Sequence, residues 1–152
     1  MQVNKKKTKV MIFNPCIAWY FMPELALDNQ EHEMVEEMRL LGVIVKSDMK
    51  WSSNSEQMLV KAYKRLWSLR RLKGMGATVD DMKDVYLKQV RSVLELAVPA
   101  WNGALTQADA KDIERVQKTA VHIMLGTNYN DCRSALDTVG LEYLVARREK
   151  IC

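Results

Sequence analysis

The chain has 152 residues, the length of one ordinary domain or of two small ones. Apolar residues make up 48% and charged residues 28%, so the chain can build a core and belongs to the globular class. The 23 Lys and Arg against 19 Asp and Glu give a net charge of +4. This excludes an acidic disordered chain and a polybasic tail protein, but it does not by itself establish nucleic-acid binding.

No segment of the sequence resembles a membrane span or a secretion signal. The longest unbroken apolar run, residues 16–22, has seven residues, whereas a spanning helix needs about 20. Met1 is followed by a polar stretch with three consecutive lysines at 5–7, unlike the start of a signal peptide. We therefore expect an intracellular protein, nuclear or cytoplasmic and not secreted, with no membrane partner.

The cysteines and histidines do not have the spacing of a metal site. They are Cys16, Cys132, Cys152, His32 and His122, and they form no CxxC pair and no zinc-binding pattern. We therefore expect a reducing compartment, no structural metal and no cofactor for this chain.

The charge is unevenly distributed along the chain. Residues 1–13 carry four lysines and no acid, residues 14–60 carry eight acids and three bases, and residues 61–73 carry six bases and no acid. A basic block is usually a solvated helix face, and the alternative is a stripe that follows the phosphates of a nucleic acid.

The first predicted elements are short strands. Residues 7–13 have the pattern of a strand that becomes fully apolar, and Asn14-Pro15 breaks it. Residues 25–27, a turn signal at Asp28-Asn29 and a second segment near Met34-Val35 predict a small hairpin.

A further strand is predicted over residues 40–45, because three β-branched residues follow one another in this apolar run. Gly42 lies inside the run, which indicates a bulge or the close approach of another backbone. With the hairpin, this strand predicts a small antiparallel sheet.

The chain then changes to helical patterns. Ser53 and Glu56 have the spacing of a capping box that starts the first helix, and residues 74–76 end it. Its apolar stripe is Leu59, Ala62, Tyr63, Leu66, Leu69 and Leu72. A second helix is predicted from Thr78, with Asp80 and Asp81 in its first turn, to Pro99, which stops it.

A third helix is predicted from Thr106 to Gly126, and two shorter helices near residues 131–139 and 141–151, separated by Gly140. The inner face of the third helix is Ile113, Val116, Ala120, Ile123 and Met124. The fold class is therefore α+β, predominantly α, with a small β part over 1–50 and a helical part over 51–152. Strand edges left open and a last helix without a stop signal predict that the chain belongs to a longer protein.

Six segments, taken in order, carry a resemblance to a known family. They are residues 4–11, residues 40–44 with Asp48 and Trp51, residues 69–73, residues 90–95 with 99–101, residues 105–106 with 113–120, and residues 140–141 with 147–149. In this order they resemble reverse transcriptases of non-LTR (LINE-type) retrotransposons over nearly the whole chain. The first segment resembles the lysine-containing segment after the catalytic hairpin of the palm. The second resembles the primer-grip strand and the entry to the thumb, and the others resemble the thumb helices.

The resemblance implies an RNA-directed DNA polymerase as the parent protein, with a palm edge and primer grip over 1–50 and a helical thumb over 51–152. The family uses carboxylates, including an aromatic-x-Asp-Asp hairpin, to hold two metal ions, which the parent enzyme would take as Mg²⁺. That hairpin is expected just upstream of Asn4, where the sequence begins. We therefore expect no enzyme activity from this chain without the missing palm and fingers. Two adjacent acidic pairs remain: Glu36-Glu37 fits a solvated strand edge, and Asp80-Asp81 fits a helix start.

The resemblance also implies roles for single residues. Lys7 would help to protonate the leaving pyrophosphate, or would be an exposed strand lysine where no nucleotide site exists. Leu41, Gly42 and Val43 would form the primer grip. The residues expected to contact an RNA–DNA hybrid are Lys61, Lys64, Arg65, Trp67, Arg71 and Lys73, through contacts that position the nucleic acid without reading its sequence.

The aromatic residues divide between core and surface. Tyr63 and Tyr86 fall on apolar stripes and are expected in the core, whereas Trp67 lies off the stripe and is the exposed aromatic that could stack on a base. His122 falls on the polar side of the third helix and is expected at the surface.

A second function remains open beside the first. The chain would then be a stand-alone helical interaction module, derived from such an element, that covers its exposed apolar strands by self-association and has no nucleic-acid role. A third possibility is that the chain is itself an enzyme. Loss of turnover on changing Asp80 or Asp81 to Asn would support it.

Overall fold

The computed structural model describes residues 8–13, 26–27, 30–31 and 33–152, with the backbone alone for 26–27 and 30–31. The fold is predominantly helical with a few short strands, which confirms the predicted α+β class. Its contacts divide it into two compact units, residues 1–51 and residues 52–152, next to the boundary expected at residue 50.

The described residues of unit 1 form three two-stranded sheets. β1 (Lys9–Val10) pairs in parallel with β4 (Glu33–Met34), and β2 (Ala26–Leu27) pairs antiparallel with β3 (Gln30–Glu31). The predicted pairing of residues 25–27 with a segment near 34–35 is therefore wrong, because Leu27 pairs with Gln30 and Met34 pairs with Val10. The expected break at Asn14-Pro15 lies outside the described residues.

The third sheet corrects the prediction of one strand over residues 40–45. β5 (Glu37–Leu40) and β6 (Val43–Lys46) pair antiparallel, and Leu41 and Gly42 form the two-residue turn between them. Their φ angles are 49° and 92°, the positive pair that matches the twist of a hairpin. Gly42 is thus a turn residue rather than a bulge, and a continuous apolar run hid the turn.

Unit 2 begins with the long helix α1 (Ser52–Gly74). The predicted capping box is wrong, because the helix already includes Ser53 in its first turn. Ala62, Leu66 and Leu69 are fully buried as expected, whereas Tyr63 is 39% exposed and does not belong to the core. The helix ends at Gly74 as predicted.

The second predicted helix is a series of shorter elements. α2 (Val79–Val85) starts after Thr78 as predicted, with Thr78 and Asp81 forming a capping box, and it continues into the π-helix η2 (Tyr86–Arg91) and into α3 (Ser92–Leu94). Ala97, the N-cap of the next helix, has a left-handed backbone with a φ of 53°. Pro99 does not stop a helix but lies in the first turn of α4 (Val98–Trp101), where proline has no hydrogen bond to lose.

The remaining helices follow the predictions closely. After η3 (Asn102–Ala104), α5 (Gln107–Leu125) has Thr106 as its N-cap and is followed by η4 (Gly126–Asn128). α6 (Cys132–Val139) and α7 (Leu144–Ile151) are separated by Gly140 as expected. On α5, Ile123 is only half-buried, and the core includes two residues that were not predicted, Gln117 and Val121.

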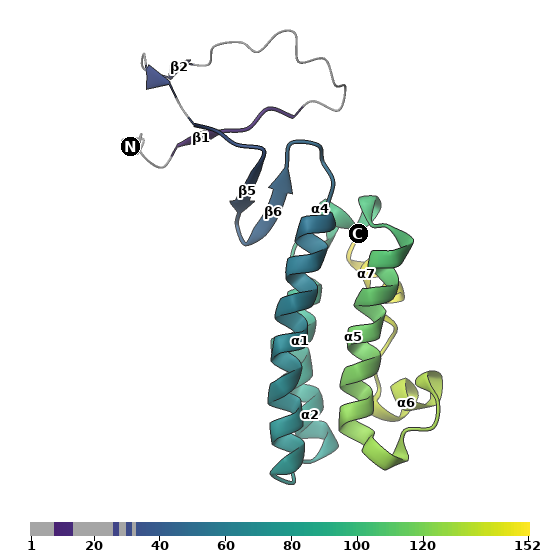
Figure 1. Ribbon diagram of the computed structural model, residues 1–152. Helices are drawn as coiled ribbons and strands as arrows, with labels where there is room; N and C mark the ends of the chain where they lie inside the picture. Colours follow the sequence, from purple (N-terminus) through teal and green to yellow (C-terminus); the bar gives the residue numbers. More distant parts are fainter. Residues whose placement is uncertain (1–7, 14–25, 28–29, 32) are drawn as a thin grey trace. The chain divides into compact units, whose positions relative to one another are not determined.

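The core of unit 2 lies between α1, α5 and the α2–α3 segment. α1 and α5 run side by side, with α2 behind α1 in the view of Figure 1. The largest fully buried side chains include Trp101, whose Nε1 donates to the Leu96 carbonyl, and Tyr86, whose hydroxyl donates to Gln117. This scaffold fixes which side of α1 remains open to solvent.

Candidate nucleic-acid interface

The open side of α1 carries basic and aromatic residues together. Residues spaced by three, four and seven positions share one side of a helix, and the buried positions 58, 62, 66 and 69 leave the opposite side to solvent. We use the name α1 face for the exposed side chains of Val60, Tyr63, Lys64, Trp67, Arg70 and Arg71. Between residues 57 and 74 the helix contains six bases and no acid, so this face is positively charged.

Trp67 and Arg71 form a cation–π pair on the α1 face. The guanidinium carbon of Arg71 lies 5.3 Å from the centre of a Trp67 ring, a cation–π contact between residues one helical turn apart. Trp67 is nevertheless 57% exposed, and among the described residues no other aromatic ring contacts it. Apolar ring surface therefore remains open beside a cation.

The six bases of residues 61–73 divide into two groups. Lys64 and Arg70 are exposed and make no hydrogen bond or ion pair with the described residues. Lys61 donates to Gln57 over 2.7 Å, and Arg65 donates to the carbonyl of Gln89 in the π-helix. Two of the bases that were predicted to contact nucleic acid, Lys61 and Arg65, are therefore hydrogen-bonded within unit 2.

Lys73 also serves the fold of unit 2. Its Nζ donates to the carbonyl of Ile123 over 2.6 Å, at the end of α5, where carbonyl groups lack helical partners and the helix dipole is negative. Gly126 makes room for it, since a Cβ at that residue would lie 2.3 Å from Nζ. Lys73 is thus a helix cap in this structure.

The predicted primer-grip residues lie in unit 1, at the β5–β6 turn. Leu41 is 93% exposed at the tip, and Val43, the first residue of β6, is buried. Lys7 lies outside the described residues, so its predicted role has no structural description.

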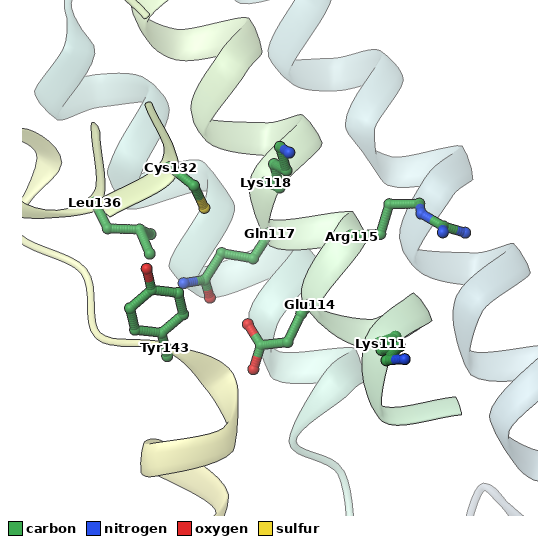
Figure 2. A pocket seen from close by; sticks show the side chains of 8 residues that line it. All are labelled: Lys111, Glu114, Arg115, Gln117, Lys118, Cys132, Leu136 and Tyr143. Atoms are coloured by element: carbon green, nitrogen blue, oxygen red, sulfur yellow. The ribbon is translucent and has the colours of Figure 1, made fainter. Parts of the chain in front are cut away.

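A second feature is a cavity of about 230 Å³ between α5, α6 and the loop before α7. Its lining residues are Lys111, Glu114, Arg115, Gln117, Lys118, Cys132, Leu136 and Tyr143. Figure 2 shows Glu114, Gln117 and Tyr143 gathered together, with the Arg115 side chain pointing away from them. Sequence analysis did not single out this cavity, because its residues are adjacent only after α6 has folded onto α5.

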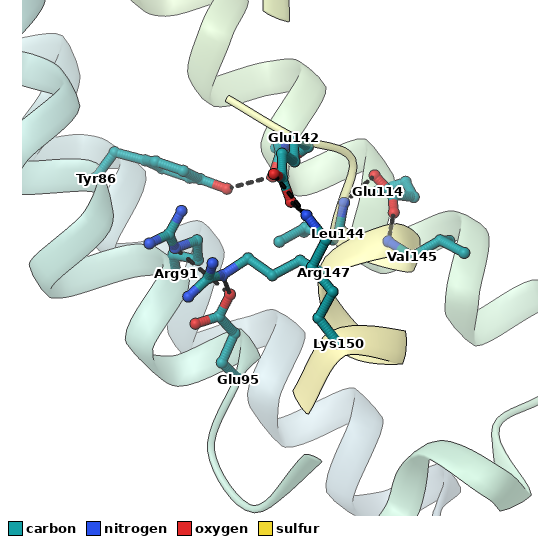
Figure 3. A network of polar contacts seen from close by, with 10 residues as sticks. Tyr86, Arg91, Glu95, Glu114, Glu142, Leu144, Val145, Arg147 and Lys150 are labelled. Atoms are coloured by element: carbon teal, nitrogen blue, oxygen red, sulfur yellow. Dashed lines mark hydrogen bonds and ion pairs between the residues drawn. The ribbon is translucent and has the colours of Figure 1, made fainter. Parts of the chain in front are cut away.

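A polar network supports the wall of this cavity (Figure 3). Both carboxylate oxygens of Glu114 accept backbone N–H groups at the start of α7, from Leu144 at 3.3 Å and from Val145 at 2.6 Å. Gln117 accepts from the Tyr86 hydroxyl and donates to the Glu142 carbonyl over 2.8 Å. These contacts bind the loop before α7 to α5.

Three electrostatic features accompany this network. Burial raises the pKa of Tyr86 well above its ordinary value, so the hydroxyl remains a hydrogen-bond donor. A hydrogen bond from Lys150 holds the pKa of Glu142 below its usual range. Glu95 pairs with both Arg91 and Arg147, which joins the end of η2 to α7.

Residues 8–13 and 33–152, with the short strands between them, contain no group of three His, Cys, Asp or Glu side chains arranged to hold a metal ion. Asp81 accepts the hydroxyl and backbone N–H of Thr78, as expected for a capping residue. No helix in this part of the chain has the length and apolar character to cross a membrane.

Comparison with known proteins identifies no relative of this chain: no family model, curated protein or solved structure matches it. Its function is therefore inferred from its own residues.

Proposed function

We propose that the chain is the palm-edge and thumb part of a non-LTR retrotransposon reverse transcriptase, and that its α1 face contacts the RNA–DNA template–primer. The chain would be catalytically incomplete, since polymerisation needs the palm and fingers. The ordered segments that resemble this family support the proposal, and the exposed charge and aromatic surface of the α1 face are the structural observation that carries it.

The geometry of the α1 face suits a phosphate backbone. Lys64 and Arg71 are seven residues apart, which is about 10 Å along a helix, or about three base-pair steps. No acid interrupts this side of α1 between residues 57 and 74. Lys64 and Arg70 are exposed, so phosphate contacts would displace none of the internal contacts made by Lys61, Arg65 and Lys73.

Trp67 and Arg71 add a second kind of contact. The Arg71 guanidinium lies over a ring of Trp67, and its N–H groups can still donate to a phosphate. The open ring surface of Trp67 can pack against a sugar or an unpaired base. Phosphate contacts therefore supply most of the affinity, and the aromatic contact adds to it.

The first experiment is a salt series of binding to an RNA–DNA hybrid duplex. The logarithm of the binding constant falls with the logarithm of the salt concentration, and each lost phosphate contact makes this negative slope shallower by about 0.9. Lys64→Ala/Arg70→Ala should therefore make it shallower by about 1.8. The matched control is Lys88→Ala/Arg133→Ala, which removes the same charge from exposed positions outside the α1 face.

The control should keep the slope of the unchanged protein. Equal slopes in both double variants, or no binding to the hybrid even at low salt, would contradict the proposal. A slope that falls only in the α1 variant supports it.

The exposed apolar side chains of Val60, Tyr63 and Trp67 favour a second candidate function. A protein-interaction module would cover such a patch by self-association. Light scattering of the full chain tests this candidate: a mass that rises with concentration and falls in Trp67→Glu supports it. A monomer at high concentration counts against it.

A further inference from the structure

The cavity between α5, α6 and the loop before α7 has the make-up of a small-ligand site that is separate from the α1 face. Its lining combines the buried side chains of Gln117 and Leu136 with the exposed side chains of Lys111, Lys118 and Tyr143. It is therefore a recess with an open side, and solvent molecules or ligands can enter it.

Two of the polar lining groups are already occupied. Both oxygens of Glu114 accept N–H groups at the start of α7, so its charge is offset by the positive end of that helix. The amide of Gln117 is occupied on both sides, by Tyr86 and by the Glu142 carbonyl. These two residues form the wall and have little capacity left for a ligand.

Two other lining groups have that capacity. Lys111 and Lys118 make no hydrogen bond or ion pair with any residue in the described part of the chain. Arg115, between them, is paired with Asp112 at 2.6 Å and points away from the cavity (Figure 2). The two free ammonium groups of Lys111 and Lys118 outweigh the single carboxylate of Glu114, so a bound group should be an anion.

The rest of the lining selects for a flat apolar body. Leu136, the Tyr143 ring and the Cys132 side chain supply apolar surface. The volume of about 230 Å³ is below the roughly 300 Å³ at which pockets for drug-sized ligands begin. The cavity therefore has room for a single ring and not for a large cofactor.

We propose that this cavity binds a small aromatic anion, a single ring that carries a phosphate or carboxylate. The ring would lie against Leu136 and Tyr143, and the anionic group would accept from the ammonium groups of Lys111 and Lys118. The proposal does not depend on nucleic-acid binding at the α1 face.

The test is an NMR titration of the ¹⁵N-labelled full chain with phenyl phosphate. Binding is monitored through the chemical shifts of the backbone amides of Leu136 and Tyr143. A ligand of this size should bind with a Kd on the order of 1 mM. Inorganic phosphate and phenol, each with half of the recognised chemistry, should bind at least about fivefold more weakly.

Lys111→Gln/Lys118→Gln should raise the Kd for phenyl phosphate at least about fivefold, since both cations lie at the surface and their loss leaves the core unchanged. Lys88→Gln, an exposed lysine outside the cavity, is the matched control and should keep the Kd. Amide shifts confined to other regions, or an unchanged Kd in the double variant, would overturn the proposal.

Discussion

At the scale of single residues, the hydroxyl of Tyr86 lies in the core and has one role there, to donate to Gln117. Gln117 in turn donates to the Glu142 carbonyl, so the pair joins the π-helix, α5 and the loop before α7. A buried polar group without its partner costs free energy, so each of these groups depends on the other. The contact therefore fixes how three segments pack together.

Tyr86→Phe should lower the free energy of unfolding at pH 7 by about 1–3 kcal/mol, because it leaves the Gln117 oxygen buried without its donor. The folded pKa of Tyr86 is raised above its ordinary value of 10.0, so its stabilising effect is complete below pH 10.0 and is lost as the pH rises further. Between pH 7 and pH 11 the free energy of unfolding of the unchanged protein should therefore fall by about 1.4 kcal/mol more than that of Tyr86→Phe.

Urea unfolding of both proteins at pH 7 and pH 11 measures these values. The difference in free energy of unfolding between the two proteins should be smaller by about 1.4 kcal/mol at pH 11. An equal difference at both pH values would contradict the role given to the Tyr86 hydroxyl. Tyr143→Phe, at an exposed tyrosine, is the control and should change each value by less than about 0.5 kcal/mol.

Periodicity predicted the position of Tyr86 but not that of Gln117. Apolar spacing identifies apolar core residues, and a polar residue on the same face is read as an interruption. One signal in the sequence was available: Gln117 is four residues after Ile113 and three before Ala120, so it lies on the same side of α5 as these apolar residues. For Lys73 no local signal exists, because the α5 carbonyl that it caps is 50 residues away in the chain.

At the scale of elements, helix ends and turns were predicted correctly where residues close in the sequence define them. Thr78, Thr106 and Gly140 define helix ends through contacts within a few residues, and all three were predicted. The turn at Leu41-Gly42 was missed because leucine is a poor residue for a positive φ and gives no turn signal. The role of Pro99 depends on the left-handed backbone at Ala97, for which alanine gives no signal in the sequence.

Leu41→Asn should stabilise the β5–β6 hairpin. Asparagine tolerates the left-handed conformation that Leu41 adopts at φ 49°, and the exposed leucine side chain contributes little to the core. A gain of about 0.5–1 kcal/mol would slow amide exchange at Met38 and Val45, which face each other in the hairpin, by about two- to fivefold. Gly42→Ala, which places a Cβ at φ 92°, should speed the same exchange, and equal rates in both variants would contradict this account.

At the scale of the whole molecule, the division into two units predicts that the helical unit is independent. Each unit has its own internal contacts, and the buried residues from Met58 to Arg148 are joined by contacts among the helices of unit 2. The change from alternating to helical periodicity near residue 50 already indicated this division in the sequence.

A protein of residues 52–152 alone should therefore unfold cooperatively, with a Tm within about 5 °C of the full chain, equivalent to a loss of about 1 kcal/mol or less. Differential scanning calorimetry of both proteins measures this. A broad transition, or a Tm lower by more than about 10 °C, would mean that residues 1–51 contribute to the core of the helical unit.

The π-helix η2 explains an odd spacing in the sequence. The fully or nearly buried residues Met82, Tyr86, Val90, Leu94 and Val98 recur at every fourth position. On a straight α-helix each such step overshoots a full turn by about 40°, so the last of them would have rotated far from the first. The wider turns over residues 86–91 absorb this excess. Deleting one polar residue there, such as Lys88, would leave Met82 and Leu94 within about 20° of the same side of a straight α-helix, so Leu94 would stay in the core without the wider turns.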